Sequence, residues 1–208
     1  EKGMDVLKII EAAKAGNYEL FKAGANGSVL GAAASCLRGC FMAKEGSQFV
    51  QCDYAAIEPR IAAWFCGEQE MLENFRNFDK GMGPDIYQIF AARFYGELDP
   101  YKIKGERRNF GKVAELQLLY QSGANTLRTQ AKDVYGVVLD EETAKRAVQE
   151  YRNSHPRIRS AWGDIQSAAH LACNNPLKIY SAGKVFFRHD GKHLFMRLPC
   201  GRKTCFPF

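Results

Sequence analysis

The sequence lacks the signals that would place it in a membrane or in a modular protein. No apolar run approaches the roughly 20 residues that a membrane-spanning helix needs. The first residues, EKGMDVLK, do not resemble a signal peptide. No internal repeat, low-complexity segment or linker separates independent domains. These absences predict a cytoplasmic protein without a membrane partner.

Zinc and disulfide signals are absent as well. The chain has seven cysteines, an odd number, and none of them forms a C-x-x-C pair or has histidines at zinc-ligand spacing. The interpretation is a reduced protein with mostly buried thiols. The cysteines are Cys36, Cys40, Cys52, Cys66, Cys173, Cys200 and Cys205.

The composition itself is that of a globular protein. With 208 residues, of which 46% are hydrophobic, the chain can bury a core and form one large or two small domains. Its 29 basic and 23 acidic side chains give a net charge of +6. This excess suits a polyanionic partner, although many soluble proteins share it.

Hydrophobic periodicity predicts an α+β protein that is mostly helical. A strand is expected over 49–53, a loop over 24–31, and a hairpin of 185–188 and 193–198 around the turn Asp190-Gly191. The long helical middle is interpreted as an insertion between strands of one sheet. Helices are expected over 5–15, 56–66, 71–78, 85–95, around Lys112, over 127–135, over 141–154 and from 156 to about 173.

The expected strand ends on a carboxylate. Asp53 at an exposed sheet edge, together with the backbone carbonyl of Tyr54, offers the hard oxygen ligands that Mg²⁺ prefers. A simpler alternative is that Asp53 caps the following helix. Glu58 has a similar alternative, as a first-turn acid that complements the helix dipole.

Four side chains recur at four-residue steps in RNFGKVAELQLLY: Arg108, Lys112, Leu116 and Tyr120. In a helix they lie along one slowly winding face. Two cations, an apolar side chain and a phenol suit a phosphate tail joined to a base and a sugar. The ordinary alternative is an amphipathic helix with a basic rim. With Asp53 upstream, however, both halves of a nucleoside triphosphate site are present.

These residues carry a resemblance. Cys52-Asp-Tyr-Ala-Ala-Ile-Glu-Pro-Arg60 resembles the first catalytic motif of family A DNA polymerases, the bacterial DNA polymerase I family. Arg108-x3-Lys112-x7-Tyr120 resembles the second motif, on that family's fingers helix. Gly111-Lys-Val-Ala-Glu-Leu116 and Tyr120-Gln-Ser-Gly123 are similar to polymerases of phages and prophages. The resemblance implies the cytoplasm of a bacterium or a phage-infected cell.

The resemblance implies a role for each matching residue. Asp53 would bind two catalytic Mg²⁺ ions, with the Tyr54 carbonyl helping one of them. Arg108 and Lys112 would hold the deoxynucleoside triphosphate, and Lys112 would also give a proton to the departing pyrophosphate. The reaction implied is deoxynucleotidyl transfer to a primer 3′-hydroxyl by two-metal chemistry.

The remaining roles concern selectivity and DNA. Glu58 would crowd the 2′ position of the sugar and bond to Tyr120, which would lie near the templating base pair. Arg38 would touch the primer–template backbone. Leu116 stands where many family members carry Phe or Tyr and, unlike them, cannot stack on a base.

The implied architecture is a partial polymerase palm with few antiparallel strands and a large helical fingers insertion. The expected boundaries are 1–60 for the palm portion with the first motif, 61–175 for the fingers, and 176–208 for a hairpin that returns toward the palm. The family's third motif, His-Asp-Glu, is not matched. His189-Asp190-Gly191 is rejected as a substitute, because its Asp lies in the turn signal and Gly replaces the acid.

The missing motif predicts a fragment that is nearly inactive alone, completed by a C-terminal segment or by a second chain of a split polymerase. A different class, a catalytically silent nucleic-acid-binding module, would also explain the net charge. A metal nuclease using Asp53 and Glu58 is a weaker alternative, since it leaves the face from Arg108 to Tyr120 unexplained.

Overall fold

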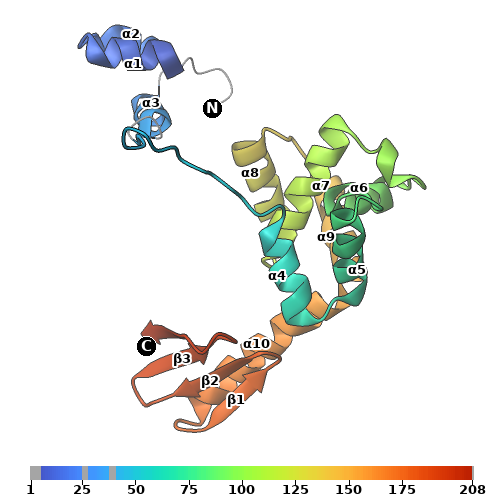
Figure 1. Ribbon diagram of the computed structural model, residues 1–208. Coiled ribbons are helices and arrows are strands. Elements are labelled where there is room, and N and C mark those ends of the chain that lie inside the picture. Colours follow the sequence, from blue (N-terminus) through green and yellow to red (C-terminus); the bar gives the residue numbers. More distant parts are fainter. Residues whose placement is uncertain (1–5, 25–27, 38–40, 208) are drawn as a thin grey trace. The chain divides into compact units, whose positions relative to one another are not determined.

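The computed structural model describes residues 6–24, 28–37 and 41–207 (Figure 1). The chain divides into two compact units, Glu1–Asp53 and Tyr54–Phe208. None of the described helices is both long and apolar enough to cross a membrane.

The described residues of the first unit form three short helices, α1 (Val6–Lys14), α2 (Tyr18–Gly24) and α3 (Val29–Cys36). Ile9 and Ala32 are fully buried between them, with Phe21 packed alongside. The expectation of a loop over 24–31 is wrong from Ser28 onward. The Ser28 side chain accepts a hydrogen bond from the Gly31 amide at 3.1 Å, and this cap starts α3 inside the glycine-rich stretch.

The strand expected over 49–53 is not formed. Residues 47–54 have no regular secondary structure, and Phe49 and Val50 are 66% and 79% exposed. A strand is stabilised by hydrogen bonds to a neighbouring strand, and no described residue pairs with this segment. Its apolar composition was therefore insufficient to predict a buried strand.

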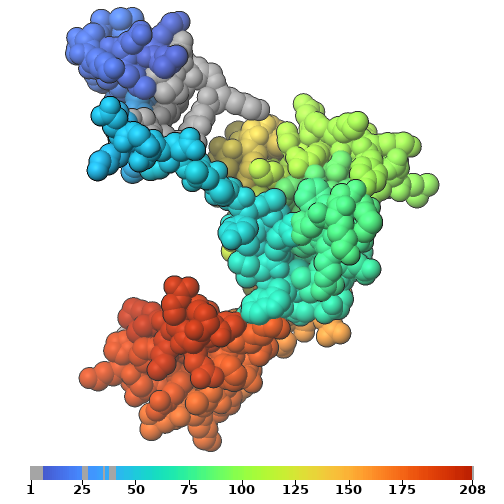
Figure 2. Space-filling model, viewed as in Figure 1, coloured from blue at the N-terminus to red at the C-terminus, as the bar shows by residue number. Residues whose placement is uncertain are grey.

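The second unit begins with a group of helices (Figure 1). They pack around an aromatic core. Phe90, Phe110 and Tyr151 lie at its centre, with ring centroids 6.2–6.3 Å from Phe90 to the other two. Figure 2 shows α4, α5 and α6 forming one continuous surface. The elements are α4 (Ile57–Cys66), α5 (Gln69–Asp79), α6 (Ile86–Tyr95), the 3-10 helix η2 (Pro100–Lys102), α7 (Gly105–Leu118), α8 (Ala124–Tyr135), α9 (Glu141–Ser154) and α10 (Pro156–Asn174).

The predicted helices of this unit are confirmed, and their start signals are visible. Asp85 caps α6 in a reciprocal capping box with Gln88, and Asp140 caps α9 through the amide of Thr143. Pro59 and Pro156 lie in the first turns of α4 and α10, where no helical hydrogen bond is lost.

Four antiparallel strands follow the helices in the order β1 (Ile179–Ala182), β2 (Val185–His189), β3 (His193–Arg197) and β4 (Lys203–Pro207). The sheet lies beside α10 (Figure 1). One of its faces packs on this helix through Ala182, Val185 and Phe187. The mostly helical α+β class and the hairpin at 190–191 are thus confirmed. Within the described ranges no strand precedes the helices, so the expected insertion between strands of one sheet is not confirmed.

The thiols differ from the expectation. Of the six cysteines in the described ranges, Cys52, Cys200 and Cys205 are exposed and the other three are half-buried. The exposed three lie in the irregular segment, in a turn and on the edge strand β4, where no core forms around them. Cys40 lies outside the described residues.

Candidate functional site

Helix α7 carries three of the four residues expected on one face. Arg108 is half-buried, Lys112 is exposed, and Leu116 packs partly against the core. Tyr120 does not belong to the helix, because α7 ends at Leu118. The next residues form a turn in which Gln121 adopts a left-handed φ of +62°, and Gln121 N donates to the Leu118 carbonyl at 3.0 Å. The single four-residue helical face is therefore wrong at its last member.

The position of α7 is fixed by a close approach to α6. A side-chain carbon added at Gly111 would lie 2.2 Å from the Tyr87 carbonyl oxygen and 3.0 Å from the Ala91 side chain. Only glycine permits this approach. The approach brings the backbones of α6 and α7 together one residue before Lys112.

Tyr120 of the second motif contacts Glu58 of the first. The Tyr120 hydroxyl donates to Glu58 Oε1 at 3.4 Å. Partial burial, the Glu58 charge and this hydrogen bond raise the pKa of Tyr120. Glu58 also lies in the first turn of α4, as its simpler interpretation predicted. The structure thus brings these two predicted site residues together.

An apolar hollow of about 360 Å³ opens beside this pair. Its walls come from α4 and α10, with the aromatic rings of Phe65 and Trp162 among them, and Glu58 and Tyr120 also line it. The Trp162 indole donates to the Leu119 carbonyl at 3.2 Å. This hydrogen bond ties α10 to the turn that carries Tyr120.

Arg108 has a partner that the sequence did not indicate. Its Nε donates to Asp85 Oδ2 at 2.7 Å, and its guanidinium lies 5.6 Å from the centre of the Tyr87 ring. The same Asp85 caps α6 through its other oxygen. One edge of the guanidinium is thus used to join α7 to α6. Its terminal nitrogens have no hydrogen-bond partner in the described part of the chain.

Arg60, the last residue of the first motif, also has a structural role. It donates to both oxygens of Asp79 at 2.7 and 2.8 Å and through Nε to the Ala55 carbonyl at 2.9 Å. Its guanidinium lies 4.4 Å from the centre of the Phe75 ring. Arg60 therefore contacts protein groups and does not face solvent alone. Arg60 joins the end of α5 to the left-handed turn at Ala56 before α4.

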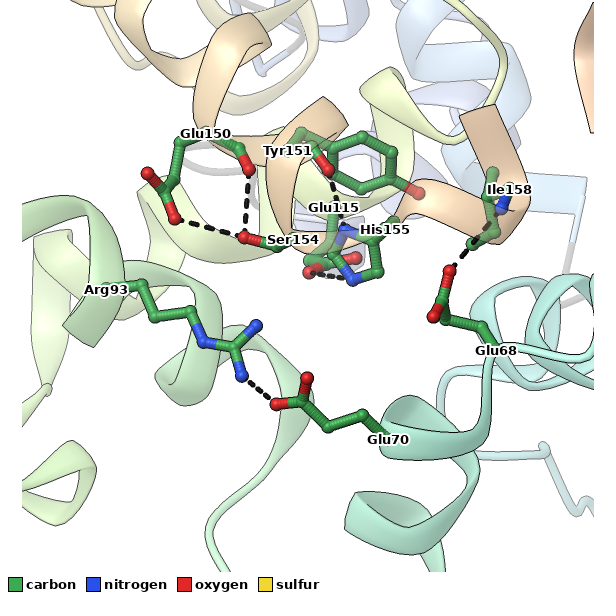
Figure 3. A network of polar contacts seen from close by, with 9 residues as sticks. All are labelled: Glu68, Glu70, Arg93, Glu115, Glu150, Tyr151, Ser154, His155 and Ile158. Carbon is green, nitrogen blue, oxygen red and sulfur yellow. Dashed lines mark hydrogen bonds and ion pairs between the residues drawn. The ribbon is translucent and has the colours of Figure 1, made fainter. Parts of the chain in front are cut away.

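Behind α7 lies a buried polar group that sequence reasoning missed (Figure 3). Glu115 is 1% exposed, and Glu115 Oε1 lies 3.6 Å from Nε2 of buried His155. His155 Nδ1 is 3.0 Å from the Tyr151 carbonyl. Because a carbonyl only accepts, Nδ1 carries the proton and Nε2 is bare.

Burial sets the charge state of this pair. It raises the pKa of Glu115 to about 8 and lowers the pKa of His155 to about 4. Glu115 is therefore a neutral acid facing a neutral imidazole near pH 7. The burial of Glu115 was indicated in the sequence by its helical spacing from apolar residues. It stands with Gly111, Ala114 and Leu118 on the buried side of α7.

Two further contacts surround the pair. Buried Glu68 accepts from the amides of Arg157 and Ile158 at 2.8 and 3.4 Å, which caps the start of α10. Arg93 pairs with Glu70 at the surface (Figure 3). These contacts tie α5, α6, α7 and α10 into one framework beneath the site.

Asp53 and Tyr54 lie on either side of the boundary between the two units. Asp53 is exposed, and its carboxylate has no hydrogen-bond or ion-pair partner within the described ranges. Helix α4 is preceded by Ala56 and has no side-chain cap, so capping of this helix by Asp53 is wrong. The convergence of Asp53 and Lys112 on one cleft stays a prediction, since they belong to different units. Arg38 lies outside the described residues.

The Asp53 carboxylate and the Tyr54 backbone carbonyl are oxygen donors of the kind that Mg²⁺ prefers. No three His, Cys, Asp or Glu residues of the described ranges are grouped to hold a metal ion. Asp53 would therefore hold such an ion only with oxygens from a bound substrate.

The chain is similar to proteins of one family. A family model described as DNA polymerase family A matches residues 28–174. The chain is 31% identical over 194 residues to a DNA polymerase of Bacillus phage SP02, covering 93% of this chain and 29% of that protein. It is 34% identical over 109 residues to DNA polymerase I of Aquifex aeolicus, covering 52% of this chain and 18% of that protein. A DNA polymerase of Mycobacterium phage D29 is 29% identical over 126 residues, or 59% of this chain and 18% of that protein. The chain thus spans less than a third of these relatives.

Proposed function

Because the chain belongs to DNA polymerase family A, we propose that it is the part of a template-directed DNA polymerase that binds the incoming deoxynucleoside triphosphate. The observation that carries the proposal is the hydrogen bond between Glu58 and Tyr120. It joins the two motifs on which the family resemblance rests, as the proposed roles require. The phage and bacterial relatives named DNA polymerases support the same class of activity.

In this proposal the cations of α7 bind the triphosphate. Lys112 is exposed and has no partner in the described ranges, so its ammonium is available to phosphate oxygens and to a departing pyrophosphate, to which it gives a proton. Arg108 contributes its terminal nitrogens while its Nε stays on Asp85. An arginine held in this way is already oriented, which lowers the entropic cost of binding phosphate.

Glu58 and Tyr120 select the sugar and the base pair. The Glu58 carboxylate, held by the Tyr120 hydroxyl, excludes a ribose by crowding its 2′ position. Leu116 offers an apolar contact without a stacking surface. Asp53 and the Tyr54 carbonyl hold Mg²⁺ together with the triphosphate. When bound, two such ions supply an activated primer hydroxyl and neutralise charge on the leaving group.

The proposed organisation follows from these roles. Residues 1–60 belong to the palm, 61–175 form the fingers, and the sheet within 176–208 returns toward the palm. Primer–template DNA and deoxynucleoside triphosphates are the proposed partners, with Arg38 on the DNA backbone.

The test measures whether nucleotide and DNA bind cooperatively. Affinity of the chain for a fluorescent primer–template is measured with Mg²⁺, with and without the nucleotide complementary to the next template base. The proposal predicts tighter binding with the complementary nucleotide and no change with a mismatched one. If nucleotide adds nothing at matched salt, the silent nucleic-acid-binding module is the better description, and affinity then depends on salt alone.

Two variants test the assigned roles. Lys112→Ala is expected to weaken the nucleotide effect about tenfold and to leave binary DNA binding nearly unchanged. Lys132→Ala, which removes the same charge from exposed α8, serves as the control. Primer extension by the polymerase that contains this chain should be lost on Asp53→Ala. Extension that survives this change would reject the role of Asp53.

A further inference from the structure

The net charge of the chain is concentrated in the sheet segment, residues 176–208. This segment contains seven Lys and Arg residues and a single acid, Asp190, an excess of six. The whole chain has a net charge of +6. The other residues therefore contain equal numbers of basic and acidic side chains. The sheet, rather than α7, is the electrostatically distinct part of the molecule.

Two faces of the sheet differ in what they contact. The inner face packs on α10 and includes Ala182, Val185 and Phe187. We call the opposite side the open face. Its residues follow from the strand registers and from alternation along each strand. They are Ile179, Ser181, Phe186, Arg188, His193, Phe195, Arg197, Lys203, Cys205 and Pro207.

Aromatic and cationic side chains alternate on the open face. Phe186 is opposite Arg197, and Arg188 is opposite Phe195. The Arg197 guanidinium lies 4.5 Å from the centre of the Phe186 ring, which presents a flat cation stacked on an aromatic ring. Arg197 is in turn opposite Lys203 on the edge strand β4. Planar surfaces and cations are thus interleaved at strand spacing.

The open face is also concave. A hollow of about 310 Å³ is lined by Phe186, Phe195 and the three cations Arg188, Arg197 and Lys203. Asp190 is at its border, but its carboxylate accepts from the amides of Lys192 and His193, both at 2.8 Å. These bonds hold the single acid in its own turn. The hollow itself is therefore dominated by positive charge.

We propose that the open face binds single-stranded nucleic acid, with bases stacked on Phe195 and on the Phe186–Arg197 pair and phosphates held by Arg188 and Lys203. Sheets that present aromatic rings and cations bind single strands in this way, because every base has a flat face and every nucleotide a charge. In a duplex the bases stay stacked on each other, so the aromatic rings of the open face would have no base to stack on. An acidic peptide would complement the charge but has no reason to require the rings.

The inference is independent of the proposed catalytic function. It needs neither Mg²⁺ nor a nucleoside triphosphate, and it involves no residue assigned to catalysis. A failed test here would leave the polymerase assignment unaffected, and the reverse also holds.

The experiment measures anisotropy of labelled DNA 20-mers with the 208-residue chain, without Mg²⁺ or nucleotide. The probes are a single strand, its RNA equivalent, the same sequence as a duplex, and a poly-glutamate peptide. Phe195→Ala and Phe195→Leu are expected to weaken single-strand binding roughly 5- to 100-fold, the range for losing a stacked base. Phe195→Tyr, which keeps an aromatic face, should restore it.

Matched controls lie on the other side of the same sheet. Phe206 is opposite Leu194, which packs on the inner face, and it is as exposed as Phe186. Phe206→Ala should therefore leave affinity unchanged. For charge, Arg188→Ala should lower the slope of log affinity against log salt by about 0.7. Lys184→Ala removes a cation that lies 5.1 Å from the Trp64 ring of α4, and it should change the slope little.

Each result bears on the proposal. If Phe195→Leu weakens single-strand binding and Phe195→Tyr restores it, bases stack on this face. Comparable affinities for DNA and RNA strands indicate stacking and charge without sugar recognition, whereas a preference for one identifies the strand. Equal effects of Phe195→Ala and Phe206→Ala, a preference for duplex, or tighter binding of the peptide than of either strand would overturn it.

Discussion

The hydroxyl of Tyr120 lies 3.4 Å from a carboxylate oxygen of Glu58, although the two residues are 62 positions apart. The contact depends on the end of α7 at Leu118, since the following turn directs Tyr120 toward the first turn of α4. A longer α7 would place Tyr120 on the helix instead. The left-handed backbone at Gln121 is therefore part of the site.

If Glu58 excludes ribonucleotides, removing its carboxylate relaxes sugar selection. Glu58→Ala is expected to lower the preference for deoxynucleotides about tenfold or more, measured as the ratio of dCTP to CTP incorporation by the polymerase that contains this chain. Tyr120→Phe keeps the carboxylate and loses only the hydrogen bond, so its effect should be smaller. Glu73→Ala on exposed α5 is the control. An unchanged ratio in Glu58→Ala would remove this residue from sugar selection.

The approach of α6 to α7 predicts opposite effects of the same substitution at two helical glycines. Gly111→Ala should destabilise the protein by about 1–3 kcal/mol, because the new methyl group meets the Tyr87 carbonyl oxygen. Gly163→Ala on α10 meets nothing within 4 Å and should stabilise by up to about 1 kcal/mol. Urea unfolding of both variants measures the difference. If both substitutions changed the free energy of unfolding in the same direction, the described packing would be contradicted.

The Arg108–Asp85 pair predicts a measurable coupling. Asp85→Asn keeps an oxygen for the capping box and removes the charge that Arg108 contacts at 2.7 Å. In a double-mutant cycle with Arg108→Ala, the coupling free energy of unfolding should be about 1 kcal/mol, since the pair is only partly buried. Nucleotide affinity should fall with Arg108→Ala and, by a smaller amount, with Asp85→Asn, because Asp85 orients the guanidinium that binds phosphate. A loss confined to Arg108→Ala would show that this orientation does not contribute to nucleotide binding.

Buried Glu115 and His155 predict how stability depends on pH. Between pH 6.5 and 8 the folded protein keeps a proton on Glu115 that the unfolded chain releases, so stability falls as pH rises, by about 2 kcal/mol. Between pH 4.5 and 6.5 the unfolded chain gains a proton on His155 while the folded protein keeps one on Glu115. The two contributions cancel and the curve is flat there.

Glu115→Gln tests this assignment because it is neutral at every pH and of nearly the same size. Thermal unfolding at pH 6.5 and 8.5 should give closely similar free energies in the variant and a clear decrease in the unaltered chain. Glu70→Gln, at the exposed Arg93 pair, should keep the decrease. If Glu115→Gln also loses stability across this interval, another group is responsible.

The helices of the second unit were predictable because their signals are local. Asp85, Asp140 and Pro156 mark three helix starts, and each acts where the sequence places it. The strand expected at 49–53 failed for the opposite reason, since its partner strand cannot be read from the segment itself. The edge strand β4 was missed because all of its residues are exposed and no alternation marks it.

The contacts of the candidate site divide in the same way, into those that the sequence indicated and those that depend on packing between helices. The Glu58–Tyr120 contact was expected from the family resemblance and is confirmed. The Arg108–Asp85 and Arg60–Asp79 pairs connect neighbouring helices, and no spacing rule within one helix predicts them. Glu115 was visible as an acid on the apolar stripe of α7. Its partner His155 could be identified only from the packing of α9 and α10 on that helix.

The uneven charge of the chain has a consequence for how it meets a polyanion. With its excess confined to one small sheet and the remainder electrically balanced, the second unit has a strong dipole moment. In the field of a nucleic acid such a body experiences a torque before any contact forms, and it arrives sheet first. Added salt shortens the range of this alignment, so the encounter rate should fall as ionic strength rises.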